Sequence, residues 1–201
     1  MHKTNVPVIG ITGGIATGKT SFCDCLREIV PAAKFFNADH AARQLVDLDP
    51  QVQTELRREF GAGVFSKSGE LNRAKLRAIV FADAAKKRAL EQILHPRIRQ
   101  QWSAASRRNS TELFFADIPL LYETGGETLC DRVVVVACSE QIQMKRLMAR
   151  SSMEQSVAQD IIRAQMPLPE KIRRADHVVW NNGDRHTLAA QARLLAKVWT
   201  Q

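Results

Sequence analysis

The stretch GGIATGKT at residues 13–20 constrains this chain more than any other feature of its sequence. It satisfies the pattern G-x-x-x-x-G-K-[ST], in which glycines let backbone N–H groups converge on phosphate oxygens and a lysine reaches the terminal phosphates. A β-branched run precedes it from Val6, and apolar residues at helical spacing, Phe22, Leu26 and Ile29, follow it. The motif therefore stands between a predicted strand and a predicted helix, the context that a phosphate-binding loop requires.

Four further apolar runs predict strands, at residues 33–37, 113–116, 132–137 and 177–180. The runs LFFA and VVVV are continuous enough for a sheet that is covered on both faces. Helical periodicity fills most of the intervening segments, so strands alternate with helices. The sequence predicts an α/β fold with a P-loop NTPase-type parallel five-stranded sheet flanked by helices.

The helical segments divide the chain into three predicted parts. Residues 1–48, 109–140 and 175–201 form the expected nucleotide-binding core. Residues 49–108 are helical in period throughout and form an insertion, and residues 141–174 form a second helical addition.

Composition excludes several classes of protein. The longest apolar run, residues 133–138, is far shorter than the roughly 18 residues that suggest a membrane span. The N-terminus carries no signal-peptide pattern, and the four cysteines show no C-x-x-C spacing, so we expect a cytoplasmic protein with reduced cysteines that serve packing. A net charge of +8 suits nucleic acid, an anionic lipid surface or a phosphorylated small molecule equally well.

Other motifs narrow the nucleotide-binding classes. The chain has neither an N-K-x-D motif nor a D-x-x-G switch, which disfavours a signalling GTPase, and 201 residues are few for a nucleic-acid motor. A small-molecule kinase fits better. A non-catalytic nucleic-acid-binding module stays an alternative because of the charge, although aromatic residues make up only 6% of the chain and leave few side chains for base stacking.

Five segments in order carry a resemblance to one kinase family. They are ITGGIATGKT, NADHAARQLV from Asn37, LHPRI from Leu94, DIPLLYE from Asp117 and RAQMPLPEKIRRAD from Arg163. Together they make nearly the whole chain similar to dephospho-CoA kinases. The resemblance implies transfer of the ATP γ-phosphate to the ribose 3′-hydroxyl of dephospho-coenzyme A, with Mg²⁺. It also implies that residues 49–108 bind the acceptor and that residues 141–174 form a lid.

The motif and the resemblance assign residues to ATP and to catalysis. The ATP-binding residues are expected to be Gly13, Gly14, Ile15, Ala16, Thr17, Gly18, Lys19, Thr20, Ser21, Arg150 and Asn182. Lys19 and Arg146 are expected to stabilise the transferring phosphoryl group. Arg146 and Arg150 share a helix face and could converge on the triphosphate with Arg163, but a solvated basic face explains these arginines as well.

Two aspartates follow predicted strands, where open α/β sheets place their ligands. Asp39 matches the family's catalytic aspartate, which would orient the acceptor hydroxyl and take its proton; an N-cap for the next helix is the alternative. Asp117 resembles a carboxylate that holds Mg²⁺ together with the Thr20 hydroxyl, and a strand-end cap is its alternative.

The acceptor site is expected to include Asp39, His95, Pro119, Leu120 and Leu121, by resemblance. A lone histidine is often a packing residue, and the adjacent Pro96 predicts a helix start or a kink. The expected partner is one small-molecule substrate, with neither nucleic acid nor membrane, for a monomer or weak homo-oligomer. Another nucleotide or metabolite kinase on the same fold is the main rival.

Four residues at three places depart from the family's pattern. Asn37 stands where aspartate is common, and Trp180 stands where aspartate is frequent. Ala16 and Thr17 replace a common Gly-Ser pair, which should constrain the phosphate loop without removing its N–H donors.

Overall fold

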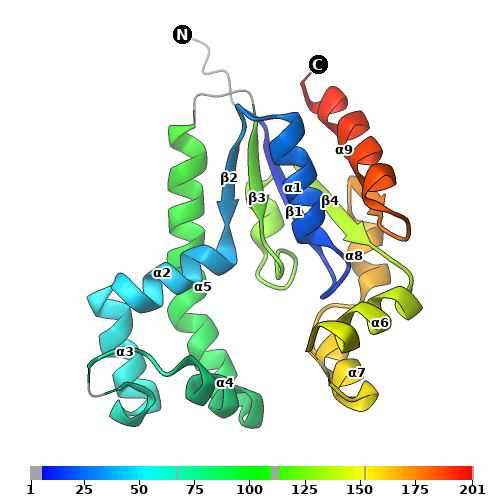
Figure 1. Cartoon of the computed structure of the whole chain (residues 1–201). Helices are drawn as coiled ribbons and strands as arrows, with labels where there is room; N and C mark the ends of the chain where they lie inside the picture. The colour runs from blue at the N-terminus through cyan, green and yellow to red at the C-terminus, as the bar shows by residue number, and fades with distance from the viewer. Residues whose placement is uncertain (1–5, 67, 110–112, 152, 201) are drawn as a thin grey trace. The chain divides into compact units, whose positions relative to one another are not determined.

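The computed structural model describes residues 6–66, 68–109, 113–151 and 153–200. Within them lies a five-stranded sheet with the strand order β2-β3-β1-β4-β5 (Figure 1). The strands are β1 Val8–Gly13, β2 Lys34–Asn37, β3 Phe114–Asp117, β4 Arg132–Ala137 and β5 His177–Trp180. β1 pairs in parallel with both β3 and β4, and β4 pairs in parallel with β5. The predicted α/β fold with a parallel sheet is confirmed.

Helices occupy the segments whose apolar residues recur at helical spacing. They are α1 Lys19–Ile29, α2 Ala38–Leu48, α3 Pro50–Phe60, α4 Arg73–Ala82, α5 Ala84–Arg108, α6 Glu140–Ser151, α7 Gln155–Arg163, α8 Leu168–Arg174 and α9 Arg185–Trp199. Short 3-10 turns, η1 Ala62–Val64 and η2 Gly126–Leu129, complete the regular structure.

The chain divides into two compact units, Met1–Phe36 with Ala105–Gln201, and Asn37–Ala104. The first unit holds the sheet, and its main core joins the sheet to α1 and α9. Ile11 of β1, Phe115 of β3 and Val134 of β4 pack there with Phe22 of α1 and Leu188 of α9. Burial of these apolar side chains fixes the strands whose carboxyl ends carry the site residues.

The second unit is helical and has its own core. Leu45 and Val46 of α2 pack there with Val52 and Leu56 of α3 and with residues of η1 and its flank. The expected insertion, residues 49–108, lies largely in this unit, whose bounds are Asn37–Ala104.

Pro96 lies inside α5 and does not start it, so the alternative of a helix start is wrong. Proline lacks the N–H that would bond the carbonyl of residue 92, and its ring disturbs the preceding turn. The side chain of Arg97 donates a hydrogen bond to the carbonyl of Ile93 at 2.7 Å and pairs with Glu55 of α3 at 2.6 Å. The bond to Ile93 stabilises the helix beside the proline, and the ion pair with Glu55 connects α5 to α3.

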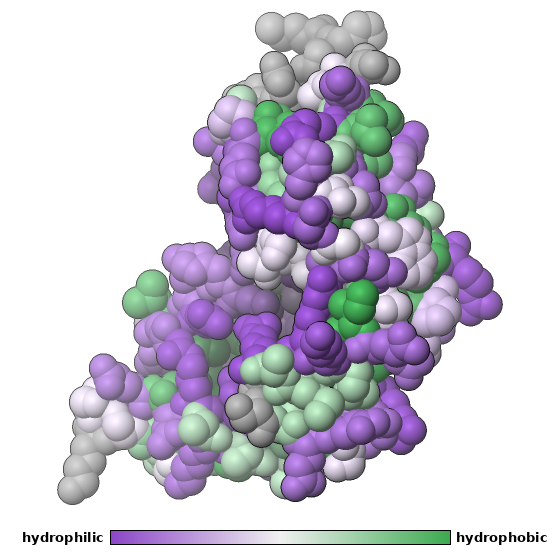
Figure 2. Space-filling model, turned by 45° about the vertical axis from the view of Figure 1, so that its right-hand side comes forward, coloured by the Kyte–Doolittle hydropathy of each residue, from purple (hydrophilic) through white to green (hydrophobic). Residues whose placement is uncertain are grey.

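No helix in the described ranges is both long enough and apolar enough to span a membrane. Figure 2 shows hydrophilic residues over most of the face in view, with hydrophobic residues in smaller groups. Three of the four cysteines, Cys23, Cys25 and Cys138, are buried as free thiols, in keeping with a packing role.

Candidate active site

The phosphate loop joins β1 to α1 and requires glycine at two positions. Gly18 has φ 93°, and a Cβ atom there would lie 1.9 Å from Nδ2 of Asn181. A Cβ atom on Gly13 would lie 2.4 Å from a backbone oxygen of β4. Side chains at these positions would therefore push the loop out of shape. Inside the loop, the Thr17 hydroxyl donates a hydrogen bond to the Gly14 carbonyl at 2.8 Å.

Ala16 has φ 59°, in the left-handed region. A Cβ atom makes this conformation cost about 1–2 kcal/mol, because it crowds the following carbonyl. The phosphate loop therefore carries backbone strain at Ala16, one of the expected departures from the family's pattern.

The first turn of α1 presents the charged group of the motif. Lys19 forms an ion pair with Asp117, and the two side chains are only 13% and 4% exposed. Thr20 and Ser21 follow in the same turn and are exposed. The helix begins at Lys19 and its N-cap is Gly18, so first-turn N–H groups and the positive end of the helix dipole adjoin the loop. Cationic and N–H donors gathered in this way suit a polyphosphate.

Asp117 is the last residue of β3, and its side chain contacts the loop lysine. A carboxylate at this position can hold a hard cation with the Thr20 hydroxyl, because oxygen ligands suit Mg²⁺. No cluster of three or more His, Cys, Asp and Glu side chains with metal-binding geometry occurs among the described residues. A cation here would therefore depend on phosphate oxygens and water for its remaining ligands.

Asn37 caps α2: its side chain accepts a hydrogen bond from the N–H of His40 at 2.7 Å. Asp39 lies in the first turn of α2 and is exposed. The alternative that Asp39 is the N-cap is therefore wrong. Asn37, one of the expected departures from the family's pattern, therefore has a structural role as the cap of α2.

α6 brings one of its arginines to the phosphate loop. Arg146 Nη1 lies 3.4 Å from the carbonyl oxygen of Thr17 and donates to it. Arg146 also contacts Cys138, whose pKa is raised by burial against the opposing effect of this guanidinium. Arg150 lies in the last turn of α6 and is exposed, as is Arg163 at the end of α7. The structure thus places Arg146 at the loop and leaves the roles of Arg150 and Arg163 as predictions.

The residue after β5 that reaches the loop is Asn181, which the sequence analysis missed. Its Nδ2 donates to the Thr17 carbonyl at 2.9 Å, and the residue is buried. The predicted residue, Asn182, instead accepts a hydrogen bond from the N–H of Ser139 at 2.8 Å and is exposed. Asn182 thus fastens the turn to the start of α6, and a contact with ATP stays a prediction.

The segment IPLL, residues 118–121, follows β3. The Pro119 carbonyl accepts hydrogen bonds from the Thr12 hydroxyl at 2.9 Å and from Lys171 at 3.1 Å. Pro119 and Leu120 are partly exposed, whereas Leu121 is fully buried beside Gly10. Leu121 therefore packs the core of this unit, and a direct acceptor contact is open only to Pro119 and Leu120.

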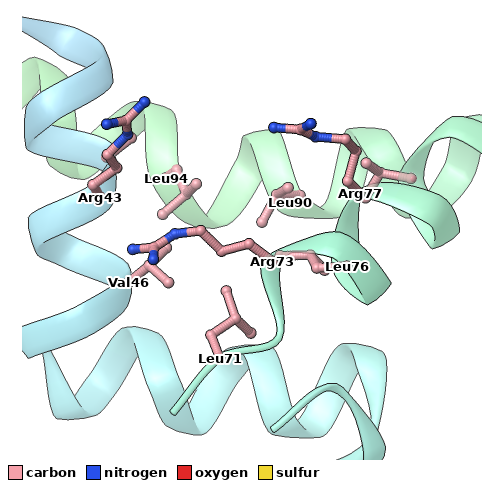
Figure 3. Close-up of a pocket in the computed structure, with 10 residues that line it drawn as sticks. Arg43, Val46, Leu71, Arg73, Leu76, Arg77, Leu90 and Leu94 are labelled. Carbon is pink, nitrogen blue, oxygen red and sulfur yellow. The ribbon is translucent and has the colours of Figure 1, made fainter.

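The helical unit contains a pocket of about 260 Å³. Its lining is mainly apolar, and Figure 3 shows three arginines on it: Arg43 from α2 and Arg73 and Arg77 from α4. The complete lining is Ala42, Arg43, Val46, Leu71, Arg73, Leu76, Arg77, Val80, Leu90 and Leu94. Arg73 pairs with Asp47 at 2.6 Å, so a charged group already holds one of the three guanidinium groups. Such a pocket suits a ligand that joins an apolar arm to an anion.

His95 lies next to the pocket residue Leu94 in sequence, on α5, but is not one of the lining residues. Burial lowers its pKa, and Glu91 acts in the opposite direction. A neutral imidazole offers hydrogen bonds and no charge, so any contact with an acceptor would be uncharged.

The family model for dephospho-CoA kinase matches residues 7–187. The chain belongs to the dephospho-CoA kinase family. The dephospho-CoA kinase of Geobacillus kaustophilus is 39% identical over 194 residues, which are 95% of this chain and 96% of that relative. The dephospho-CoA kinase of Anaeromyxobacter dehalogenans is 44% identical over 193 residues, or 94% and 90% of the two chains.

Solved structures agree on the fold. A crystal structure from Thermus thermophilus matches with a TM-score of 0.80 and 32% identity, covering 97% of this chain and 99% of that one. A Campylobacter jejuni dephospho-CoA kinase, with a TM-score of 0.65 and 24% identity over 96% and 97% of the chains, has the same fold. Shikimate kinase from Acinetobacter baumannii shares it more distantly, with a TM-score of 0.51 and 17% identity over 96% and 92% of the chains.

As a member of the dephospho-CoA kinase family, the chain is a phosphate-loop kinase that uses ATP. The family's motif residues lie in both units, because residues 13–21 belong to the first and Asp39 to the second.

Besides Asn181, four residues that hold the phosphate loop or support it escaped the sequence analysis of this dephospho-CoA kinase family member. Gln143, Gln165 and Lys171 bond the phosphate loop directly, and Glu123 pairs with Lys171. The available signal was the family resemblance, because Glu123, Gln165 and Lys171 lie in two of the segments that carry it. Lys171 lies on the short helix α8. Periodicity does not separate such a lysine from its solvated neighbours.

Proposed function

We propose that this chain transfers the γ-phosphate of ATP to the ribose 3′-hydroxyl of dephospho-coenzyme A, the last step of coenzyme A synthesis. Membership of the dephospho-CoA kinase family over residues 7–187 carries the proposal, together with a complete phosphate loop. The geometry of the described residues supports a role for each part of the site.

The phosphate loop would bind the triphosphate. Backbone N–H groups of residues 13–21 and the N-terminus of α1 supply donors, and Lys19 supplies a positive charge. Arg146 lies against the loop through the Thr17 carbonyl, within reach of the same phosphates. Guanidinium and ammonium groups stabilise the charge that spreads over the γ-phosphoryl oxygens during transfer.

Thr20 and Asp117 would hold Mg²⁺. Both supply oxygen ligands, the ligand type that Mg²⁺ prefers, and both lie at the loop: Thr20 in the first turn of α1 and Asp117 in contact with Lys19. The ion, when bound, neutralises charge on the β- and γ-phosphates. Asp117 would then exchange its contact with Lys19 for the ion, and Lys19 would turn to the phosphates.

Asp39 would act on the acceptor. Its exposed carboxylate lies two residues beyond β2, and Asn37 rather than Asp39 caps α2, so the carboxylate is available for chemistry. A ribose hydroxyl has a pKa far above 7, and a carboxylate can orient it and accept its proton as the P–O bond forms. The β–γ P–O bond breaks, and ADP leaves with that bonding electron pair.

The pocket of the helical unit would receive the acceptor. Dephospho-coenzyme A has a long arm, in which methyl and methylene groups alternate with amides, and a diphosphate. The pocket offers leucine and valine side chains together with Arg43, Arg73 and Arg77. Guanidinium groups bind phosphate oxygens in paired geometry. We assign the arm to the apolar lining and the diphosphate to the arginines.

The working form would be a monomer or weak homo-oligomer in the cytoplasm, acting on a small molecule without nucleic acid or membrane. Light scattering of the purified chain measures its state, and a mass of one chain, 22.5 kDa, at micromolar concentration is expected. A stable larger assembly would overturn this part of the proposal.

The test of the activity compares acceptors. Purified chain is incubated with Mg²⁺-ATP and with dephospho-coenzyme A, AMP, dTMP or shikimate, and ADP formation is followed. We expect kcat/KM for dephospho-coenzyme A to exceed every other value by at least about a hundredfold, because the pocket matches that acceptor. Faster phosphorylation of any other acceptor would favour a different metabolite kinase.

A further inference from the structure

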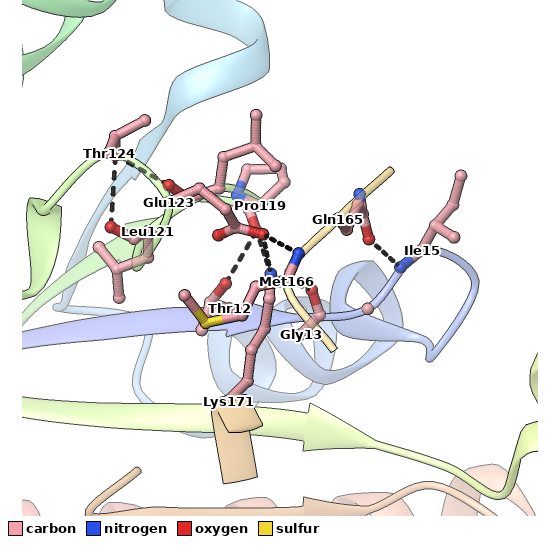
Figure 4. Close-up of polar contacts among 12 residues, drawn as sticks. Thr12, Gly13, Ile15, Pro119, Leu121, Glu123, Thr124, Gln165, Met166 and Lys171 are labelled. Atoms are coloured by element: carbon pink, nitrogen blue, oxygen red, sulfur yellow. Dashed lines mark hydrogen bonds and ion pairs between the residues drawn. The ribbon is translucent and has the colours of Figure 1, made fainter. Parts of the chain in front are cut away.

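Two glutamines hold the same residue of the phosphate loop through the two peptide groups that flank it. The Ile15 N–H donates a hydrogen bond to Oε1 of Gln165 at 2.9 Å, and the Ile15 carbonyl accepts one from Nε2 of Gln143 at 2.8 Å. Gln143 lies on α6, and Gln165 lies on the connection between α7 and α8. The contact of Gln165 is drawn in Figure 4. Both backbone polar groups of Ile15 are thus bonded by side chains from the segment spanning α6 to α8.

Lys171 holds the base of the loop from the same segment. The lysine lies on α8, and its side chain is fully buried. Its ammonium group donates to the Gly13 carbonyl at 3.3 Å and to the Pro119 carbonyl at 3.1 Å, and it pairs with Glu123 at 2.8 Å. A buried ammonium group is stable only when its donors are satisfied, and these three acceptors match its three N–H groups (Figure 4).

Glu123 connects Lys171 to the segment between α7 and α8. Its Oε1 accepts a hydrogen bond from the N–H of Met166 at 3.0 Å, next to Gln165 in the chain. The connection between α7 and α8 is therefore fixed at two consecutive residues, by the phosphate loop at Gln165 and by Glu123 at Met166. Displacing this connection would break both bonds together.

We propose that Gln143 and Gln165 are positioning residues, which hold Ile15 so that the phosphate loop adopts its nucleotide-binding shape when α6 to α8 are docked on it. The inference rests on the proposed function only in that the loop binds ATP. Neither glutamine needs to touch the nucleotide for this role, because each acts through the Ile15 peptide groups.

The expected size of the effect follows from the loop's freedom. Phosphate binding requires several N–H groups to converge, and a loop that is released at Ile15 populates that shape for a smaller share of the time. Apparent affinity falls in proportion to that share. Breaking one of these partly buried hydrogen bonds is expected to weaken ATP binding about tenfold.

One glutamine accepts its hydrogen bond and the other donates, so the same substitution, glutamine to glutamate, should affect the two bonds differently. Gln165 accepts, so Gln165→Glu keeps an acceptor for the Ile15 N–H. Gln143 donates, so Gln143→Glu replaces the donor with a carboxylate that faces the Ile15 carbonyl. Both variants add one negative charge beside Ile15, so their general electrostatic effects on the bound triphosphate are matched.

The measurement is the dissociation constant of ATP by isothermal titration calorimetry at pH 8, where a carboxyl side chain is ordinarily ionised. We expect Gln143→Glu to bind ATP at least about tenfold more weakly than Gln165→Glu. Equal losses in both variants would show an effect of charge alone and would overturn the proposal, as would unchanged binding by Gln143→Glu.

Uncharged variants guard against misfolding and against protonation of a buried carboxyl. Gln143→Leu and Gln165→Leu each remove one bond without adding charge, and both are expected to weaken ATP binding about tenfold with an unchanged circular dichroism spectrum. Wild-type binding by both would overturn the proposal. These titrations measure ATP binding without any acceptor. They therefore test the role of the two glutamines even if the chain fails to phosphorylate dephospho-coenzyme A.

Discussion

Lys19 and Asp117 form a direct ion pair between the first turn of α1 and the end of β3. The lysine expected to bind phosphates and the carboxylate expected to bind Mg²⁺ therefore satisfy each other in this state. Because the two side chains are nearly buried, the pair shields two charges that would otherwise be poorly solvated. Binding of Mg²⁺-ATP would replace this ion pair with two contacts between opposite charges, one between Lys19 and the phosphates and one between Asp117 and the ion.

Asp117→Asn should separate nucleotide binding from metal dependence. The change leaves Lys19 without its charged partner, so ATP binding in the presence of EDTA should become a few times tighter, while the Mg²⁺-dependent kcat falls by at least about a hundredfold. Calorimetry with and without Mg²⁺, combined with steady-state kinetics, measures both quantities. An unchanged kcat would remove Asp117 from the metal site.

Asp39→Asn should abolish most turnover and leave ATP binding nearly intact. The amide keeps a similar shape and loses the base, so kcat should fall by about a hundredfold or more. The matched control is Asp24→Asn, which alters an exposed carboxylate that pairs with Arg27 on α1. Near wild-type turnover in Asp39→Asn would exclude Asp39 as the base.

Ala16→Gly should stabilise the protein. Glycine removes the strain at φ 59°, which is worth about 1–2 kcal/mol. Part of this gain in stability is lost, because glycine also raises the conformational entropy of the unfolded chain. The net gain should raise Tm by about 2 °C for a chain of this size. Ala78→Gly, on the exposed face of α4, should lower Tm instead, because glycine disfavours a helix interior. A lower Tm for Ala16→Gly would contradict the strain that the backbone geometry indicates.

Arg77→Ala should affect the acceptor and not ATP. Loss of a guanidinium from the pocket should raise KM for dephospho-coenzyme A about tenfold and leave KM for ATP unchanged. Arg88→Ala is the control, because Arg88 is an exposed residue of α5 outside the pocket lining. Equal changes for both substrates would argue against an acceptor role for this pocket.

The sequence predicts the sheet and the phosphate loop because their signals are local. β-branched runs mark the strands, and the spacing of Gly13, Gly18 and Lys19 marks a turn whose shape needs those residues. The start of α2 was harder, since Asn37 and Asp39 are both good N-caps. The helix begins at Ala38, two residues before the start near His40 that a cap at Asp39 would give, so Asn37 is the cap and Asp39 is not.

The residues that hold the loop could not be predicted in the same way. Gln143, Gln165 and Asn181 contact it across 128, 150 and 164 positions of sequence. An amide side chain on a helix or turn has the same appearance whether it faces water or a backbone carbonyl. The choice of Asn182 over Asn181 shows the limit: a turn of two asparagines gives no local sign of which side chain points inward.

Transfer to the ribose 3′-hydroxyl is the central claim, and the position of the new phosphate tests it most directly. The product of dephospho-coenzyme A and Mg²⁺-ATP is purified, and its ³¹P and ¹H NMR spectra locate the added group. We predict a phosphomonoester whose phosphorus couples to the ribose H3′ proton, together with one ADP per product. A phosphate at any other position, or release of inorganic phosphate with unchanged acceptor, would contradict the account.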